Sequence, residues 1–302
     1  MGNEGQTRDT GVDLYLDLLK RCVLNLIYQD PAIRQPWDQS TDQEYVPFDR
    51  EKRLAALDWP SQAHTQIGMR RLDNVQELVT DVLASGTPGD LIETGVWRGG
   101  STIFMRGILK AHGVTDRLVW VADSFEGFPT TEEQGASARS FSSPEMGAVR
   151  GYFEGLREAS PPALAASLDR MMEGASLDDV RDRFDRYGLL DEQVRFLPGW
   201  FRDTLPVAPI ERLALLRLDG DLYDSTYDAL DALYPRLSVG GYVIVDDYGW
   251  VEECRNAVQD YLAAHGQVHD LAAVDLRGRA GRVVARPERL GDPQEIEDVH
   301  RA

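Results

Sequence analysis

The sequence predicts an α/β protein built on a doubly wound, mostly parallel β-sheet, and three observations support this fold class. Short apolar segments recur between residues 90 and 245, and segments with helical spacing of apolar residues separate them. The short segments are apolar throughout, which is typical of strands that are buried on both faces. Acidic and glycine residues follow several of these strands directly, as at Glu93, Asp123 and Asp219. Open α/β sheets bind ligands at that edge, so we expect the functional residues there.

Two helices and a loop precede the repeating core. Residues Asp13–Leu24 have apolar residues at helical spacing and predict an amphipathic helix that packs as an appendage, a lid or a partner surface. The segment Pro31–Pro60 is polar and aromatic and contains four prolines, so it predicts a loop. A second helix runs from Leu72 to Leu83 and ends at the stop signal Ser85–Gly89.

The core repeats strand and helix. Five apolar strands are predicted, at Asp90–Glu93, Leu118–Ala122, Gln193–Leu197, Leu213–Leu218 and Tyr242–Val245. The intervening helices are predicted at about Gly100–Lys110, Asp178–Tyr187 and Cys254–His265, and two weaker strands near Val268–Asp275 and Arg282–Ala285 close the sheet. We expect one large domain at residues 70–286, preceded by an N-terminal helix and lid segment at 1–69 and followed by an acidic tail at 287–302. A long stretch without periodicity, about Thr130–Pro162, predicts a lid insertion in that domain.

The composition excludes several classes of function. The formal charge is −19, from 51 acidic and 32 basic residues, and such a surface repels nucleic acid and anionic lipid. No apolar run is long enough to cross a bilayer, and Met1–Asp13 lacks the character of a signal peptide, so we expect a cytoplasmic protein. The two cysteines, Cys22 and Cys254, fit neither a disulfide framework nor a zinc site.

A glycine-rich turn follows the first core strand. Glu93 is succeeded by Gly95 and then by Gly99 and Gly100, which open a helix whose free N–H groups can bind an anion. A tight turn between strand and helix needs glycines in any case, but their spacing differs from the dinucleotide-binding fingerprint. An acid followed by these glycines resembles the first motif of class I methyltransferases, where Glu93 would lie near the ammonium group of the donor. Asp123 ends the second core strand and can accept hydrogen bonds from both ribose hydroxyls or, alternatively, cap a helix.

Four aspartates follow the fourth and fifth core strands, and we call Asp219, Asp221, Asp246 and Asp247 the acid cluster. Because neighbouring strands of this sheet end at one edge, the four carboxylates would repel one another strongly without a cation. Oxygen ligands suit Mg²⁺ or Ca²⁺ rather than zinc. Mg²⁺ keeps open water positions, so a substrate hydroxyl can replace one of them.

Six segments together resemble the macrocin O-methyltransferase family, whose members methylate sugar hydroxyls of macrolide and aminocoumarin antibiotics. These segments are His64–Met69, Glu93–Gly100, Asp123–Pro129, Leu197–Phe201, Asp219–Tyr223 and Asp246–Tyr248. The resemblance extends from about Leu14 to Ala264. It implies a Rossmann-like class I methyltransferase fold, with S-adenosylmethionine as methyl donor, Mg²⁺ as cofactor and a glycosylated natural product as acceptor.

The resemblance also implies roles for particular residues. The metal ligands would be Asp219, Asp246 and Asp247, and Asp221 would be the general base, although the proton could instead go to Asp219. Side chains two residues apart in an extended segment share a face, so Asp221 can reach a hydroxyl held by the metal of Asp219. The donor would contact Thr65, Gln66, Met69, Glu93, Thr94, Gly95, Ser101, Asp123, Ser124, Phe125, Gly199 and Trp200.

This resemblance says least about the identity of the acceptor. The stretch Thr130–Pro162 is longer and more polar than the lid of the family, Trp37–Asp58 has no clear counterpart, and Gln66 replaces an expected apolar residue. Three alternatives stay open: a cation-dependent methyltransferase of a small phenol or catechol, a nicotinamide-dependent sugar oxidoreductase, and a non-catalytic donor-binding assembly protein. The oxidoreductase leaves Asp246 and Asp247 unexplained. We also expect a homo-oligomer that associates through the N-terminal helix.

Overall fold

A computed structural model describes residues 10–35, 43, 45–129, 137, 139–140, 175–266 and 271–282. Its main sheet has seven strands in the order β6-β5-β4-β7-β8-β10-β9. Their bounds are Asp90–Thr94 (β4), Val119–Asp123 (β5), Val194–Pro198 (β6), Leu213–Leu218 (β7), Leu237–Val245 (β8), Ala272–Ala273 (β9) and Arg279–Arg282 (β10). The strands β4 to β8 pair in parallel, and β10 pairs antiparallel with β8 and β9.

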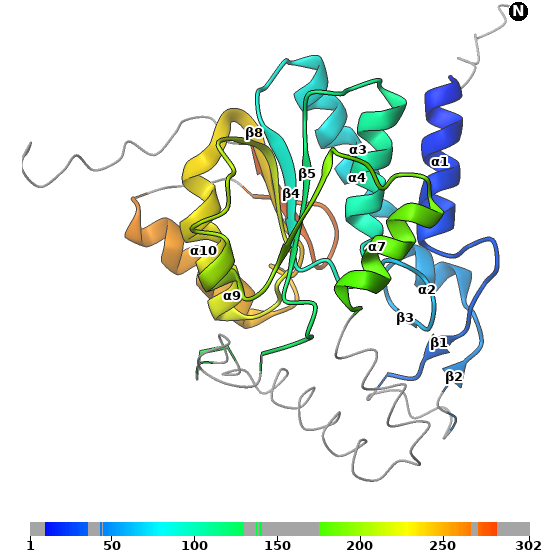
Figure 1. Ribbon diagram of the computed structural model, residues 1–302. Coiled ribbons are helices and arrows are strands. Elements are labelled where there is room, and N and C mark those ends of the chain that lie inside the picture. Colours follow the sequence, from blue (N-terminus) through cyan, green and yellow to red (C-terminus); the bar gives the residue numbers. More distant parts are fainter. Residues whose placement is uncertain are drawn as a thin grey trace, which may run out of the picture.

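Helices cover both faces of this sheet (Figure 1). One face carries α1 (Gly11–Val23), α3 (Gly68–Ala84), α4 (Gly100–Ala111) and α7 (Leu177–Arg186), and the other carries α9 (Tyr223–Leu233) and α10 (Glu252–Ala264). Successive residues of β4 enter separate hydrophobic cores, since Leu91 packs in the first and Ile92 in the second. The predicted doubly wound fold is therefore confirmed.

The chain reverses direction across the sheet at the first core strand. From β4 it moves outward to β5 and β6, then returns to β7 on the other side of β4. The crevice at the carboxyl end of β4 is thus the topological switch point, where open α/β sheets bind their ligands. The antiparallel β10 lies between β8 and β9. This inserted strand distinguishes the strand order of the sheet from that of dinucleotide-binding sheets.

The N-terminal helix α1 packs directly on the core. Thr10 and Asp13 form a capping box at its start. Its buried residue Leu19 occupies the space beside Gly107 of α4, where any Cβ atom would overlap the leucine side chain. Lys20 donates to Asp73 of α3 at 2.5 Å. The helix is therefore a fixed layer of the domain.

The predicted loop at Pro31–Pro60 contains regular structure, so that prediction was wrong in part. It forms the small antiparallel sheet β2-β1-β3, with β1 at Ala32–Ile33, β2 at Tyr45–Val46 and β3 at Trp59–Pro60, and the helix α2 at Arg50–Leu54. Arg53, which is 1% exposed, anchors this region through Asp30 and Asp58, each at 2.8 Å. Strands of two residues are too short to show a periodicity, which explains the error.

Sequence analysis also missed α9 and the short helices at Phe201–Thr204 (α8) and Tyr234–Arg236. The polar residues around Tyr223–Tyr227 masked the helical spacing of Ala229, Leu230 and Leu233, which are buried. The predicted lid insertion lies outside the described residues except for 137, 139 and 140, and the predicted tail at 287–302 lies outside them altogether. Within the described part, no helix has the length and apolar character needed to cross a membrane.

Candidate active site

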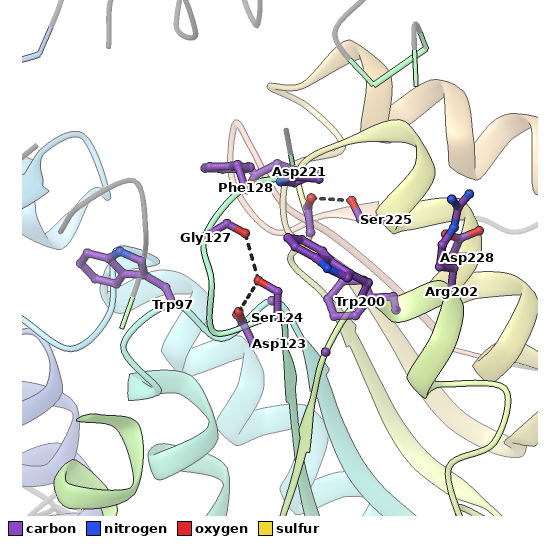
Figure 2. A pocket seen from close by; sticks show the side chains of 15 residues that line it. Trp97, Asp123, Ser124, Gly127, Phe128, Trp200, Arg202, Asp221, Ser225 and Asp228 are labelled. Atoms are coloured by element: carbon purple, nitrogen blue, oxygen red, sulfur yellow. Dashed lines mark hydrogen bonds and ion pairs between the residues drawn. The ribbon is translucent and has the colours of Figure 1, made fainter. Parts of the chain in front are cut away.

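A pocket of about 140 Å³ opens at the carboxyl ends of β4, β5, β6 and β7 (Figure 2). Its lining combines backbone, aromatic and carboxyl groups. The lining residues are Gly95, Trp97, Asp123, Ser124, Gly127, Phe128, Pro129, Gly199, Trp200, Phe201, Arg202, Gly220, Asp221, Ser225 and Asp228. Trp200 crosses the middle of the pocket, with Asp123 and Ser124 below it and Asp221 and Ser225 above (Figure 2).

The turn after β4 approaches the backbone of β7 closely. Gly95 has φ +86°, and a Cβ atom at this position would overlap the carbonyl oxygen of Asp219. Glycine is therefore required here on both conformational and steric grounds. Trp97 adopts a left-handed conformation with φ +47° at the pocket wall. At the start of α4, the amide of Gly100 donates to the carbonyl of His64 at 2.9 Å, so the segment before α3 lies across this helix end.

Asp123 is fixed by backbone donors at the end of β5. It accepts hydrogen bonds from the amides of Val96 at 2.7 Å and Phe125 at 2.8 Å. Burial raises the pKa of Asp123, and these hydrogen bonds oppose the rise. Each carboxylate oxygen has a second lone pair, so Asp123 can still accept from a ligand in the pocket that it lines.

Hydrogen bonds between strand ends bring the acid cluster together. The amide of Asp219 donates to Thr94, and the amide of Asp246 donates to Leu218, both at 2.9 Å. Oxygen atoms of Asp219, Asp246 and Asp247 lie within 4.8 Å of one another. Asp221, in a left-handed conformation with φ +57°, interacts with the Asp247 side chain and also lines the pocket. The acid cluster therefore borders the pocket through Asp221.

Burial and mutual repulsion shift these carboxyl groups toward the protonated form. Burial is the main cause, and neighbouring carboxylates add to it. The pKa of Asp221 rises to about 7 and that of Asp219 to about 6. The pKa of Asp247 lies well above its ordinary value. Asp246 differs, because two arginines hold its pKa below the ordinary value despite burial.

Those two arginines were missed from the sequence, where the acid cluster was expected to rely on a metal cation alone. Arg217 of β7 is 0% exposed and hydrogen-bonds Glu93, Asp219 and Asp246. Arg71 of α3 pairs with Asp246 and, at 3.1 Å, with Asp275. A buried arginine inside an apolar strand needs carboxylate partners, so Arg217 was the available signal.

The carboxyl groups of the cluster nevertheless outnumber its guanidinium groups. Arg217 and Arg71 pair with Glu93, Asp219 and Asp246, and neither arginine forms an ion pair with Asp221 or Asp247 among the described residues. The buried Oδ2 atom of Asp247 has no hydrogen-bond partner among the described residues. An all-oxygen donor set with an orphaned carboxylate oxygen fits a hard divalent cation such as Mg²⁺.

The predicted donor-binding residues fall into three groups. Gly95, Asp123, Ser124, Gly199 and Trp200 line the pocket. Glu93, Thr94 and Ser101 are buried beneath it, and Glu93 Oε2 and Ser101 Oγ lack hydrogen-bond partners within the described residues. Thr65, Gln66, Met69 and Phe125 lie outside the pocket lining, and Met69 and Phe125 pack against the hydrophobic core. The structure therefore brings the first two groups together at the pocket and leaves the third group outside the pocket lining.

The pocket also contains residues that sequence analysis did not select. Trp97, Phe128 and Phe201 supply aromatic surface, and Arg202 pairs with Asp228 at 3.8 Å at the opposite side from Trp97 (Figure 2). Trp97 and Phe128 belong to segments that had already been singled out. Arg202, Ser225 and Asp228 carry no such signal, because short polar runs in helices are ordinarily solvent-exposed.

The strand order, the glycine turn and the acidic strand ends define a class I methyltransferase. A solved structure, that of the O-methyltransferase NovP, agrees: it is 44% identical, the alignment covers 91% of this chain and 100% of that chain, and the TM-score is 0.76. More specifically, the family model described as macrocin O-methyltransferase matches residues 12–150 and 149–282. The chain belongs to this family and is an O-methyltransferase, as the sequence predicted.

Characterised relatives are similar over nearly their whole length. A tetracenomycin-C rhamnosyl 4'-O-methyltransferase of Streptomyces olivaceus is 50% identical, with 94% of this chain and 98% of the relative covered. The mycinamicin III 3''-O-methyltransferase of Micromonospora griseorubida is 47% identical, with 89% of this chain and 96% of the relative covered. The nicotinamide-dependent and non-catalytic alternatives are therefore wrong.

Proposed function

We propose that this enzyme transfers a methyl group from S-adenosylmethionine, with the assistance of Mg²⁺, to a hydroxyl group of a sugar, including deoxysugars, attached to a natural product such as an antibiotic. The observation that carries the proposal is the position of Asp221, which lines the pocket and also belongs to the acid cluster. A donor in the pocket and a hydroxyl beside the acid cluster would therefore meet at one carboxylate.

The donor occupies the pocket in this proposal. Asp123 accepts the ribose hydroxyls, and Gly199 and Trp200 enclose the base end. The methionine end lies toward Gly95, above the buried Glu93. An ammonium group there would donate to Glu93 Oε2, which has no partner among the described residues, while Arg217 holds Oε1.

The acceptor lies on the other side of Asp221. Asp219, Asp246 and Asp247 would hold the divalent cation, which acts as a Lewis acid for a neighbouring hydroxyl when bound. A sugar hydroxyl is a weak acid, so its proton needs an acceptor during attack. Asp221 lines the pocket beside the acid cluster, so its carboxylate can take that proton. The hydroxyl oxygen then forms its bond to the methyl carbon as the carbon–sulfur bond breaks.

The name of one relative supports the acceptor class, because the tetracenomycin enzyme is named as a 4'-O-methyltransferase of a rhamnosyl-tetracenomycin. Self-association is a further part of the proposal. The α1 helix turns Leu14 and Leu18, 60% and 53% exposed, away from the core, and a second copy could cover them. A cytoplasmic location follows from dependence on the intracellular methyl donor.

The test is to incubate the protein with S-adenosylmethionine, Mg²⁺ and a panel that contains glycosylated natural products, their aglycones and simple catechols. Mass spectrometry should show the gain of one methyl group on the glycosylated compounds alone, and EDTA should abolish it. Methylation of catechols but not of sugars would support the phenol-directed alternative. Full activity in EDTA would exclude the metal-assisted mechanism.

A further inference from the structure

One fully buried guanidinium lies between the two halves of the proposed active site. Arg217 is the penultimate residue of β7, and its side chain is 0% exposed. Its Nη1 atom donates to Glu93 and, at 2.6 Å, to Asp219, while its Nη2 atom donates to Asp246. The three acids follow or end three neighbouring strands, β4, β7 and β8.

These three acids serve different ligands in the proposed function. Glu93 is buried two residues before Gly95 of the pocket lining, and Asp219 and Asp246 belong to the proposed metal site. Arg217 touches acids of both groups, yet it is absent from the pocket lining. Arg217 therefore links the acid on the donor side to the two acids on the metal side.

We propose that Arg217 is a positioning residue that couples the donor site to the metal site. The proposal rests on the proposed function. A guanidinium is planar and presents its donors in a fixed fork, so one rigid group sets the directions of all three carboxylates. A reorientation of Glu93 toward a donor ammonium thus changes how the same fork holds Asp219 and Asp246. Burial strengthens these interactions, because water cannot replace a misplaced hydrogen bond.

Arg71 provides a selective contrast. It also contacts Asp246, but its other partner is Asp275 rather than Glu93. Arg71 therefore touches the metal side alone, and its replacement can reach the donor side only through Arg217. If Arg71→Lys still weakened donor binding in an Arg217→Lys background, a route other than Arg217 would connect the two sites, and the proposal would be contradicted.

The main variant is Arg217→Lys, which keeps the charge but removes the fork. S-adenosylhomocysteine binding is measured by calorimetry in EDTA, and Mn²⁺ binding is measured by electron paramagnetic resonance without donor. Arg217→Lys should weaken both about tenfold, equivalent to about 1.4 kcal/mol at each site. Arg71→Lys should also weaken Mn²⁺ binding, and any effect that it has on donor binding should disappear in the Arg217→Lys background.

Arg106→Lys is the matched control. Arg106 is 4% exposed and chelates Asp191 at 3.0 and 2.6 Å, far from the acid cluster in the fold. It should lose thermal stability much as Arg217→Lys does, while both dissociation constants stay at the wild-type values. This separates a general loss of packing from a loss of positioning.

A double-mutant cycle tests the route of the coupling. In a Glu93→Gln background, Arg217→Lys should no longer affect S-adenosylhomocysteine binding, but should still weaken Mn²⁺ binding. Wild-type affinity of Arg217→Lys for both ligands would overturn the proposal, as would additive effects on donor binding. If wild-type protein binds neither ligand, the proposed function fails instead, and the two failures are distinguishable.

A charge-balanced variant keeps the test open if Arg217→Lys does not fold. Glu93→Gln combined with Arg217→Gln removes one buried acid and one buried base together. Net charge is unchanged, so weaker Mn²⁺ binding, again about tenfold, reports lost positioning of Asp219 and Asp246. Wild-type Mn²⁺ affinity in this double variant would overturn the proposal.

Discussion

Two buried clusters of charged residues in this protein differ in how completely their hydrogen bonds are satisfied. Around Arg53, each group has partners: Asp30 accepts from Arg53, Asn25 and Ser61, and it also receives the backbone amide of Gln62 at 2.6 Å. Arg53 donates in addition to Asp58 and to the carbonyl of Leu24. We call this network closed because each of its charged groups has a partner. It joins segments that otherwise contain few apolar residues.

The acid cluster around Arg217 is open. Carboxyl groups outnumber guanidinium groups, and Glu93 Oε2 and Asp247 Oδ2 are buried without partners in the described part of the chain. Burial therefore raises the pKa of Asp247, whereas hydrogen bonds from Arg53 and Gln62 overcome burial and hold that of Asp30 low. The difference supports a structural role for the Arg53 network and the proposed cation-binding role for the acid cluster.

The largest expected effect falls on turnover. Asp221→Asn keeps the shape of the side chain but removes the proposed base, so kcat should fall about 10²–10⁴-fold. Affinity for S-adenosylhomocysteine and thermal stability should stay near wild type. Unchanged kcat, measured by mass spectrometry on an accepted substrate, would remove Asp221 from the role of base.

Replacement of Arg53 should break the closed network. Arg53→Met leaves Asp30 and Asp58 buried without their counter-charge, and loss of one partner of such a pair costs about 3–5 kcal/mol. Urea unfolding should show this loss, while the protein that remains folded binds S-adenosylhomocysteine normally. Arg50→Met, at an exposed position of the same helix, is the control and should have little effect. Equal stability of the two variants would contradict the assignment of the Arg53 network.

Asp123→Ala tests the donor side of the open site, and its expected effect is of intermediate size. It removes a carboxylate that lines the pocket, and donor binding should weaken by about 1–3 kcal/mol. Calorimetry with S-adenosylhomocysteine measures the change, and Asp116→Ala on the exposed surface is the control. If affinity does not change, Asp123 does not contact the donor.

The smallest effect is on stability as a function of pH. Because the folded-state pKa of Asp247 lies above its ordinary value of 3.8, the folded protein binds this proton more tightly than the unfolded chain. The metal-free wild type should therefore lose stability as pH rises above about 3.8 through the raised pKa. In EDTA, Asp247→Asn should equal wild type in acid and exceed it at neutral pH.

Asp30→Asn should show the opposite sign. The lowered pKa of Asp30 contributes stability above its ordinary value of 3.8 and loses it as pH falls through the folded-state value. This variant should therefore be less stable than wild type at neutral pH and approach it in acid. Thermal unfolding over a pH series measures both variants. The same sign for both would remove the distinction between closed and open clusters.

The repeating core could be predicted well from the sequence, because strands that are buried in a parallel sheet consist of apolar runs, as at Leu213–Leu218. The sequence also predicted that acids would meet at the strand ends, because parallel strands align those ends. It did not predict the counter-charges, since Arg71 and Asp246 are 175 residues apart. The small sheet of β1, β2 and β3 likewise depends on Arg53 and Asp30, whose contact no local pattern encodes.

The contact between Gly95 and the Asp219 carbonyl has a consequence for how this enzyme could diversify. Because the turns after β4 and β7 touch through backbone atoms, the spacing between them does not depend on the identity of neighbouring side chains. Substitutions at Phe128, Arg202 or Asp228 can therefore reshape the walls without altering that spacing. Side chains at the walls can therefore change while the spacing of the two turns stays fixed, whereas any side chain at position 95 would force the turns apart.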